Sequence, residues 1–130
     1  MTKKTALFFV VGLIVLSLTQ TLFSASFEDE YKKVKDAIAR VELGIYRYKV
    51  VNSVYPADGN RNLVSSLSSD YITFEPQIIK NGLLIDPWGH SYIYQRYDQG
   101  DNLRWHTYVI YSIGPNGIDE NGRGDDIGNW

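Results

Sequence analysis

The chain has 130 residues, of which 44% are hydrophobic and 14% aromatic, and its 13 basic and 15 acidic side chains give a formal charge of −2. This composition supports one folded domain with a single core and argues against general disorder. Cysteine is absent, which excludes disulfides, thiolate catalysis and cysteine-based zinc sites. The sequence has no basic stripe with interleaved aromatic residues, so we expect no nucleic-acid partner.

Residues 1–26 are predicted to target the chain to a membrane. Lys3 and Lys4 precede a mostly apolar run at 6–25, ALFFVVGLIVLSLTQTLFSA, which becomes more polar at its outer end. The basic residues, the apolar run and the small residues at 24–26 are typical of a signal peptide that is cleaved after residue 26. The same run has the roughly 20 residues that an uncleaved membrane anchor needs. Both interpretations stay open, and in both the positive-inside rule keeps the lysines in the cytoplasm and exports the rest.

An amphipathic helix is predicted from Glu28 to Val51, within the remaining segment 27–130, which we expect to form one globular domain. Apolar residues recur along this helix at steps of four and three, so they form one stripe. Acidic residues begin the helix and basic residues end it, in agreement with the helix dipole. We expect the stripe to face the core, and its members are Val34, Ile38, Val41, Ile45 and Tyr48.

Short strands are expected after this helix. Pro56 and Gly59 end the helix, and a shorter helical or irregular piece follows at 63–67. Segments rich in aromatic and β-branched residues predict strands, and Gly and Asp at 97–102 predict a hairpin loop. The expected strands are 83–85, 91–96 and 105–112. The fold class that follows is α+β, with one long N-terminal helix packed on a small antiparallel β-sheet.

The stretch DPWGH at 86–90 has the residue types of a type I turn. Asp at the first position, Pro at the second and Gly at the fourth are preferred there, and the Asp side chain accepts hydrogen bonds from backbone N–H groups. We therefore interpret Asp86 as a structural residue and expect Trp88 to close the edge of the core.

Three blocks of the sequence, in this order, resemble one protein family. The blocks VYPADGNRNLVSSL, DPWGHSYIY and YSIGPNGIDENGRGDDIGNW are similar to those of the major pseudopilin, protein G, of the bacterial type II secretion system. The resemblance covers about Tyr31 to Trp130. It implies a pseudopilin-like fold and the role of a structural subunit in a pathway that supports export of folded proteins across the outer membrane. The implied partners are other pseudopilin or secretion-system subunits, further copies of the chain, and the inner membrane through 6–25 if this run is uncleaved.

The N-terminal segment departs from this family. Family precursors carry a short basic leader that ends in Gly and is followed by Phe-Thr-Leu-Ile-Glu, whereas residues 1–26 contain neither this motif nor any acidic residue. We therefore predict maturation that does not depend on prepilin peptidase. Two hypotheses follow: a pseudopilin subunit anchored in the inner membrane with its globular domain in the periplasm, or a soluble exported calcium-binding module that kept only the pseudopilin head.

The Gly-rich acidic loop at the C-terminus binds calcium in the resembled family, so calcium is the implied cofactor. This hard cation takes about six to eight oxygen ligands, and glycines let backbone carbonyls turn toward it. Transferred to this chain, the ligands are the carbonyls of Ile113 and Ile118 and the side chains of Asn116, Asp125 and Asp126. The family usually has Asp in place of Asn116, and Asp119 or Glu120 could supply the missing charge. The alternative interpretation is a solvated acidic turn.

The sequence lacks the common catalytic patterns. Its two histidines, His90 and His106, do not form a zinc-binding helix pattern, and no Gly-x-Ser-x-Gly elbow occurs. His106 alternates with apolar neighbours, which favours a surface or edge position in a strand. Asp86 and His106 could act as an acid–base pair only if the fold joined them, so we expect no enzyme activity.

Overall fold

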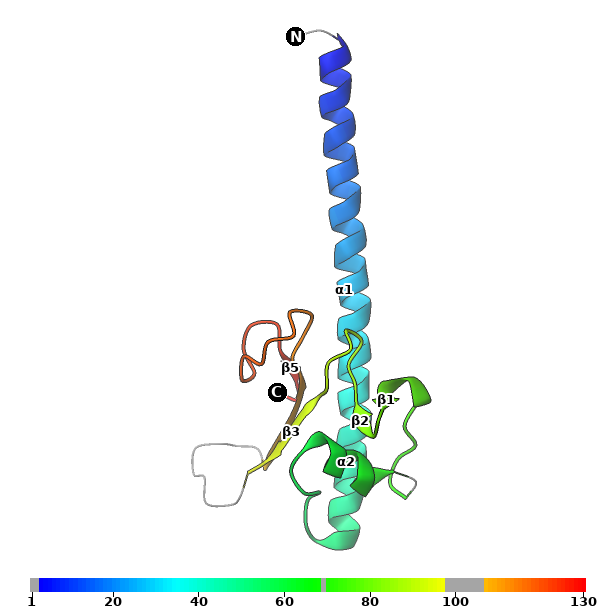
Figure 1. The fold of residues 1–130 in the computed structure, drawn as a ribbon, viewed down its shortest axis with the longest axis vertical. Coiled ribbons are helices and arrows are strands. Elements are labelled where there is room, and N and C mark those ends of the chain that lie inside the picture. The colour runs from blue at the N-terminus through cyan, green and yellow to red at the C-terminus, as the bar shows by residue number, and fades with distance from the viewer. Residues whose placement is uncertain (1–2, 69, 98–106) are drawn as a thin grey trace. The chain divides into compact units, whose positions relative to one another are not determined.

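The computed structural model describes residues 3–68, 70–97 and 107–130 and divides the chain into two compact units, Met1–Lys32 and Lys33–Trp130. Its helices are α1 (Lys3–Asn52), α2 (Asn60–Leu67) and the short 3₁₀ helix η1 (Pro76–Ile78). Its strands are β1 (Ile79–Lys80), β2 (Leu83–Leu84), β3 (Ile93–Arg96), β4 (Tyr108–Ser112) and β5 (Ile127–Gly128) (Figure 1). The helix that the sequence predicted from Glu28 therefore begins at Lys3.

In the first unit, residues 3–26 of the segment predicted to target a membrane are helical. The large apolar side chains described there are exposed, and Phe8 and Phe23 are 79% and 77% exposed. The hydroxyls of Ser17, Thr19 and Thr21 donate hydrogen bonds of 2.8–2.9 Å to backbone carbonyls about one turn earlier in the helix. Hydroxyls that are bonded in this way tolerate an apolar environment. Helix α1 is long and apolar enough to cross a membrane, although a signal sequence has the same features.

The hydrophobic core of the second unit lies against one face of α1. The four aliphatic residues of the predicted stripe are at most 2% exposed and Tyr48 packs beside them, so the predicted core-facing stripe is confirmed. Other elements complete the core with Leu63 and Leu67 of α2, Leu84 of β2 and Ile110 of β4. Non-adjacent segments of the chain thus bury their apolar residues against a single helix.

Gly44 allows α1 to approach the segment around the end of α2. A Cβ atom at this position would overlap Cγ2 of Ile72 and would lie 3.1 Å from Cδ1 of Leu67. Glycine inside a helix costs roughly 1 kcal/mol relative to alanine. The close packing offsets this cost, because a larger side chain would separate the two apolar surfaces.

The strands form two antiparallel sheets instead of the single sheet that the sequence predicted. β3, β4 and β5 form a three-stranded sheet with β4 in the centre, whereas β2 pairs with β1. In the larger sheet, Tyr94 pairs with Ile110 and Tyr111 pairs with Gly128. The pairing of β1 with β2 has a local cause: Asn81 and Gly82 have φ values of 54° and 72°, and a type I′ hairpin turn requires two positive values.

Two of the sequence predictions extend beyond the described residues. The strand predicted at 105–112 is observed as β4 from Tyr108, and its first positions, with His106, lie outside the described residues. The hairpin loop predicted at 97–102 also lies outside them from residue 98 onward. The strand predicted at 91–96 is observed as β3 and begins at Ile93.

Asn60, the first residue of α2, links this helix to the strands through three hydrogen bonds. Its side-chain nitrogen donates to the carbonyls of Leu84, at 2.8 Å, and Tyr92, at 2.7 Å. Its side-chain oxygen accepts from the amide of Leu84 at 2.7 Å. One polar side chain therefore holds β2 and the residue before β3 beside α2.

Candidate metal site in the C-terminal loop

Asp86 is a buried carboxylate, 4% exposed, that organises a turn and the end of β4. Its Oδ1 accepts hydrogen bonds from the amides of Trp88, at 3.1 Å, and His90, at 2.8 Å. Its Oδ2 accepts a hydrogen bond of 2.6 Å from the hydroxyl of Ser112. The turn closes through the Gly89 amide, which donates to the Asp86 carbonyl at 3.0 Å, and Trp88 packs against the core. The structural interpretation of Asp86 and the position expected for Trp88 are both confirmed.

The C-terminal loop, residues 113–126, leaves β4 and returns to the sheet as β5 (Figure 1). Its residues with positive φ are Gly114, Gly117, Asn121, Gly122 and Gly124. Glycine is also needed at 114 and 124 because neighbouring carboxylates leave no room for a side chain. A Cβ atom on Gly114 would lie 2.6 Å from Oδ2 of Asp125, and a Cβ atom on Gly124 would overlap the Glu120 carboxylate. These glycines therefore allow the backbone to approach Asp125 and Glu120.

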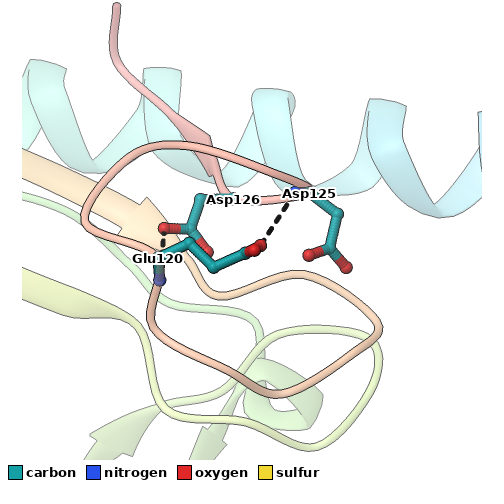
Figure 2. Close-up of side chains that lie close together, drawn as sticks. All are labelled: Glu120, Asp125 and Asp126. Carbon is teal, nitrogen blue, oxygen red and sulfur yellow. Dashed lines mark hydrogen bonds between the residues drawn. The ribbon is translucent and has the colours of Figure 1, made fainter.

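Three acidic side chains of the loop converge. Glu120, Asp125 and Asp126 each offer a carboxylate oxygen, and these oxygens lie within 4.8 Å of one another (Figure 2). Backbone amides hold the side chains in place. The Asp125 amide donates to Oε2 of Glu120 at 3.2 Å, while the amides of Glu120 and Gly122 donate to Oδ2 of Asp126 at 3.1 and 2.8 Å. Like charges at this separation repel one another, so a positive charge would stabilise the cluster.

Two oxygens of this cluster have no hydrogen-bond partner within the described part of the chain. Oδ1 of Asp125 and Oδ1 of Asp126 are buried, and neither has a partner among the residues that the structure describes. Buried carboxylate oxygens are normally hydrogen-bonded or bound to a cation, because removing their charge from water is costly. The second oxygen of each side chain already accepts a hydrogen bond from a backbone amide. The two free oxygens therefore fit a hard cation such as Ca²⁺, which prefers carboxylate and carbonyl ligands.

The structure brings several of the sequence-predicted ligands together. Asp125 and Asp126 are adjacent in the cluster. Asn116 is bonded to it, since its backbone amide donates to Oδ2 of Asp125 at 3.0 Å and its side-chain nitrogen to Oε2 of Glu120 at 3.2 Å. The side-chain oxygen of Asn116 accepts from the Ile118 amide at 2.7 Å. Glu120, one of the two residues considered as a replacement for the missing charge, therefore lies beside Asn116.

Asp119, the other residue considered, is engaged elsewhere. Its Oδ1 accepts from the hydroxyl of Tyr111 at 3.0 Å and from the amide of Asn121 at 2.9 Å. Burial, together with the hydrogen bond to Asp119 and the charges of Asp119 and Asp126, raises the pKa of Tyr111 well above its usual range. The phenol consequently stays protonated at neutral pH and keeps its hydrogen for Asp119.

The two predicted carbonyl ligands differ in their surroundings. Ile113 is joined to Gly114, whose backbone packs directly against Asp125. Ile118 has a side chain that is 62% exposed, and its observed bond is from its backbone amide to Asn116. Position 113 is therefore next to the acidic cluster, and position 118 is linked to it through Asn116.

The residues that follow the loop are bonded to α1 by side chains that the sequence analysis did not identify. Lys35 donates from Nζ to the Gly128 carbonyl at 2.7 Å, and Asn129 donates from Nδ2 to Oε1 of Glu42 at 3.0 Å. The Asn129 oxygen also accepts from the Ile110 amide of β4 at 3.1 Å. The one sequence signal for these contacts is the spacing of Lys35 and Glu42 by two helical turns, which places both on one side of the buried stripe.

His90 contacts the beginning of the loop. Its Nδ1 lies 3.0 Å from the Gly114 carbonyl oxygen and 3.7 Å from Oδ2 of Asp86. A carbonyl oxygen can only accept, so the ring carries a proton on Nδ1 in this hydrogen bond. The acid–base pair that the sequence analysis considered, Asp86 with His106, is not tested by the structure, because His106 lies outside the described residues.

Comparisons with known proteins agree with this fold. The family model of the type II secretion system (T2SS), protein G, matches residues 21–130. A relative, the type II secretion system core protein G of Vibrio cholerae serotype O1, is 34% identical over 110 residues, which cover 78% of this chain and 68% of the relative. The crystal structure of the major pseudopilin from the type 2 secretion system of enterohaemorrhagic Escherichia coli superposes with a TM-score of 0.56 at 26% identity, covering 84% of this chain and 89% of that one. The chain therefore belongs to the type II secretion system protein G family and is a structural subunit, a pseudopilin, of that secretion system.

Proposed function

We propose that this pseudopilin binds Ca²⁺ in its C-terminal loop and is held in the inner membrane by the first part of α1, with its second unit in the periplasm. The observation that carries the calcium proposal is the pair of buried Oδ1 atoms of Asp125 and Asp126, which have no hydrogen-bond partner among the described residues. The membrane proposal rests on the exposed apolar side chains of the first unit. Other secretion-system subunits are its partners in this proposal.

The charge of the C-terminal segment explains why an ion would stabilise it. Four acidic side chains lie between 113 and 130, where Arg123 is the one basic residue. Backbone amides orient the carboxylates of Glu120 and Asp126, but they leave the net negative charge unchanged. A divalent cation would turn mutual repulsion among these carboxylates into attraction to a common centre.

The proposed ligand set combines the structure with the family resemblance. Glu120, Asp125 and Asp126 supply three carboxylates from one cluster. The resemblance adds the carbonyls of Ile113 and Ile118 as neutral oxygens. Because the side-chain oxygen of Asn116 already accepts from the Ile118 amide, we assign to Glu120 the charge that the family's Asp supplies. Asn116 then shapes the loop and remains a neutral neighbour of the site.

Thermal unfolding of the full chain in detergent tests the calcium proposal. Ca²⁺ at a hundredfold excess over its dissociation constant stabilises a protein by about 2.7 kcal/mol, provided that the unfolded chain does not bind it. For a folded unit of this size, this free energy corresponds to an increase of roughly 10 °C in the melting temperature. We expect a chelator to lower the melting temperature by that order and added Ca²⁺ to restore it.

Magnesium is the matched control for this measurement. Mg²⁺ carries the same charge but requires a smaller, nearly octahedral shell and gives up its water reluctantly. We therefore expect it to restore little of the lost stability. An unchanged melting curve in chelator, together with no heat of Ca²⁺ binding in calorimetry, would leave the loop as a solvated acidic turn.

The second candidate is a soluble exported calcium-binding module. It is favoured by the small residues at 24–26, which fit signal cleavage, and by the family match, which begins at residue 21 and leaves 1–20 outside it. Mass spectrometry of the mature chain from cells with and without prepilin peptidase separates the candidates. A chain that starts at Phe27 supports the soluble module, and an uncut chain in the membrane fraction supports the anchored subunit. A new N-terminus close to the start of the chain, lost without the peptidase, would refute peptidase-independent maturation.

A further inference from the structure

We infer that Ser112, Asp86 and His90 are positioning residues for the calcium site. Ser112 and Asp86 hold the peptide group between Ile113 and Gly114 in place before an ion binds, and His90 holds the peptide group that follows it. This inference rests on the proposed calcium function, in which the Ile113 carbonyl is a ligand. The three residues would not touch the ion themselves. They would act through the backbone that carries one of its ligands.

Ser112 is the central residue of this arrangement. It is the last residue of β4 and is completely buried. Its hydroxyl donates to Oδ2 of Asp86 at 2.6 Å and accepts a hydrogen bond from the Gly114 amide at 3.1 Å. A hydroxyl has one hydrogen and two lone pairs, so donation to the carboxylate leaves a lone pair available for Gly114. Asp86 therefore determines in which direction Ser112 can accept.

The Gly114 amide and the Ile113 carbonyl belong to the same peptide group. This group is planar and trans, so its N–H and C=O bonds point in opposite directions. A hydrogen bond that fixes the Gly114 N–H on Ser112 consequently fixes the direction of the Ile113 carbonyl on the other side. The hydrogen-bond chain from the Asp86 carboxylate through Ser112 also polarises the peptide group and places more negative charge on that carbonyl oxygen.

His90 holds the next peptide group. Its Nδ1–H donates to the Gly114 carbonyl at 3.0 Å, so both backbone polar groups of Gly114 are bonded to side chains. Asp86 also accepts from the His90 amide at 2.8 Å, which places the imidazole at the beginning of the loop. Gly114 has φ of 68° and packs against Asp125. A residue in this conformation, bonded on both sides, is a defined junction between β4 and the acidic cluster.

Residues that orient metal ligands without touching the metal typically change its affinity by about 10- to 100-fold when they are mutated. We therefore expect Ser112→Ala to raise the dissociation constant for Ca²⁺ of the full chain in detergent by about tenfold, measured by calorimetry. In chelator, we expect the Gly114 amide of this variant to exchange with solvent faster than in the wild-type chain. The matched control is Ser68→Ala, because the Ser68 hydroxyl donates a hydrogen bond of the same length, 2.6 Å, to Val64 outside the loop. This control should leave the dissociation constant unchanged.

A pair of substitutions at His90 provides an independent test, which is informative even if Ser112→Ala does not fold. His90→Phe keeps a planar ring and removes the donor, so it should weaken Ca²⁺ binding severalfold. His90→Asn keeps an N–H donor near the position of Nδ1 and should restore most of the affinity. Ca²⁺ binding within twofold of wild type in both Ser112→Ala and His90→Phe would overturn the positioning role. A wild-type chain that does not bind Ca²⁺ would instead overturn the proposed function on which this role rests.

Discussion

Replacing Asn60 with Asp tests the hydrogen bonds that link α2 to the strands. The substitution keeps the shape of the side chain but replaces the NH₂ group, which donates to the carbonyls of Leu84 and Tyr92, with an oxygen that can only accept when ionised. The Leu84 carbonyl keeps a partner because it also accepts from the Tyr92 amide at 3.0 Å. The Tyr92 carbonyl loses this side-chain partner, and a negative charge faces two carbonyl oxygens.

The expected loss of stability can be worked out from these contacts. The substitution removes two hydrogen bonds at about 1 kcal/mol each, and the Tyr92 carbonyl that loses a partner costs about 1 kcal/mol more. The expected loss in the free energy of unfolding is therefore about 3 kcal/mol near neutral pH. This loss corresponds to a decrease of roughly 12 °C in the melting temperature of a unit of this size. The matched control is Asn62→Asp in the same helix, because Asn62 is exposed and donates a single bond, to the Asp58 carbonyl. We expect that change to cost well under half as much.

The pH dependence of Asn60→Asp has a definite sign. The two carbonyls disfavour the ionised form, so the pKa of the new carboxyl in the folded state is raised above its unfolded value of about 3.9. The folded state then binds more protons than the unfolded state between these two pKa values. The penalty should therefore be complete above the folded pKa and should decrease as pH falls through it. Unfolding by urea at several pH values measures this trend, and equal losses for Asn60→Asp and Asn62→Asp at neutral pH would refute the reasoning.

Three further outcomes are expected. Gly44→Ala should destabilise the second unit by about 1–2 kcal/mol in urea unfolding, because overpacking outweighs the gain in helix propensity. Gly12→Ala, at a position with open space around it, should not destabilise this unit. Equal effects of the two substitutions would contradict the packing argument. Asp126→Asn should remove the Ca²⁺ response of the melting temperature, and a retained response would exclude this carboxylate as a ligand. Asn116→Asp should tighten Ca²⁺ binding in calorimetry by adding a negative charge beside Glu120, and weaker binding would show that the Asn116 side-chain amide is needed.

The parts of the fold that follow local rules were predictable from the sequence. The buried stripe of α1 was found because its side chains recur with the helical period, and the turn at Asp86 was found because each position of a type I turn has its own residue preference. The division into two sheets was missed although Asn81 and Gly82 carry a hairpin signal. The reason is that β1 has only two residues, which is too short for a hydrophobic pattern to appear.

The candidate metal site was predictable only in part. A Gly-rich acidic segment indicates a possible cation site, but the choice of ligands depends on how the loop closes, and the resemblance supplied that choice. Sequence alone left Asp119 and Glu120 equivalent. In the folded loop, Asp119 is bonded to Tyr111, whereas Glu120 is held beside Asp125 by the Asp125 amide. Such a difference arises from the way the loop folds back on itself and on the end of β4, and residue preferences at single positions do not encode it.

The loop is ordered because the rest of the second unit fixes both of its ends. Near its start, Gly114 is bonded to Ser112 and His90. Just after its end, Gly128 and Asn129 are bonded to Lys35 and Glu42 of α1. Fixed ends reduce the conformational entropy that the glycines would otherwise cost on folding. The same constraint keeps the acidic side chains together, where they repel one another. The fold thus supplies the order of the loop and concentrates its negative charge, and a cation that binds there adds stability by neutralising this charge.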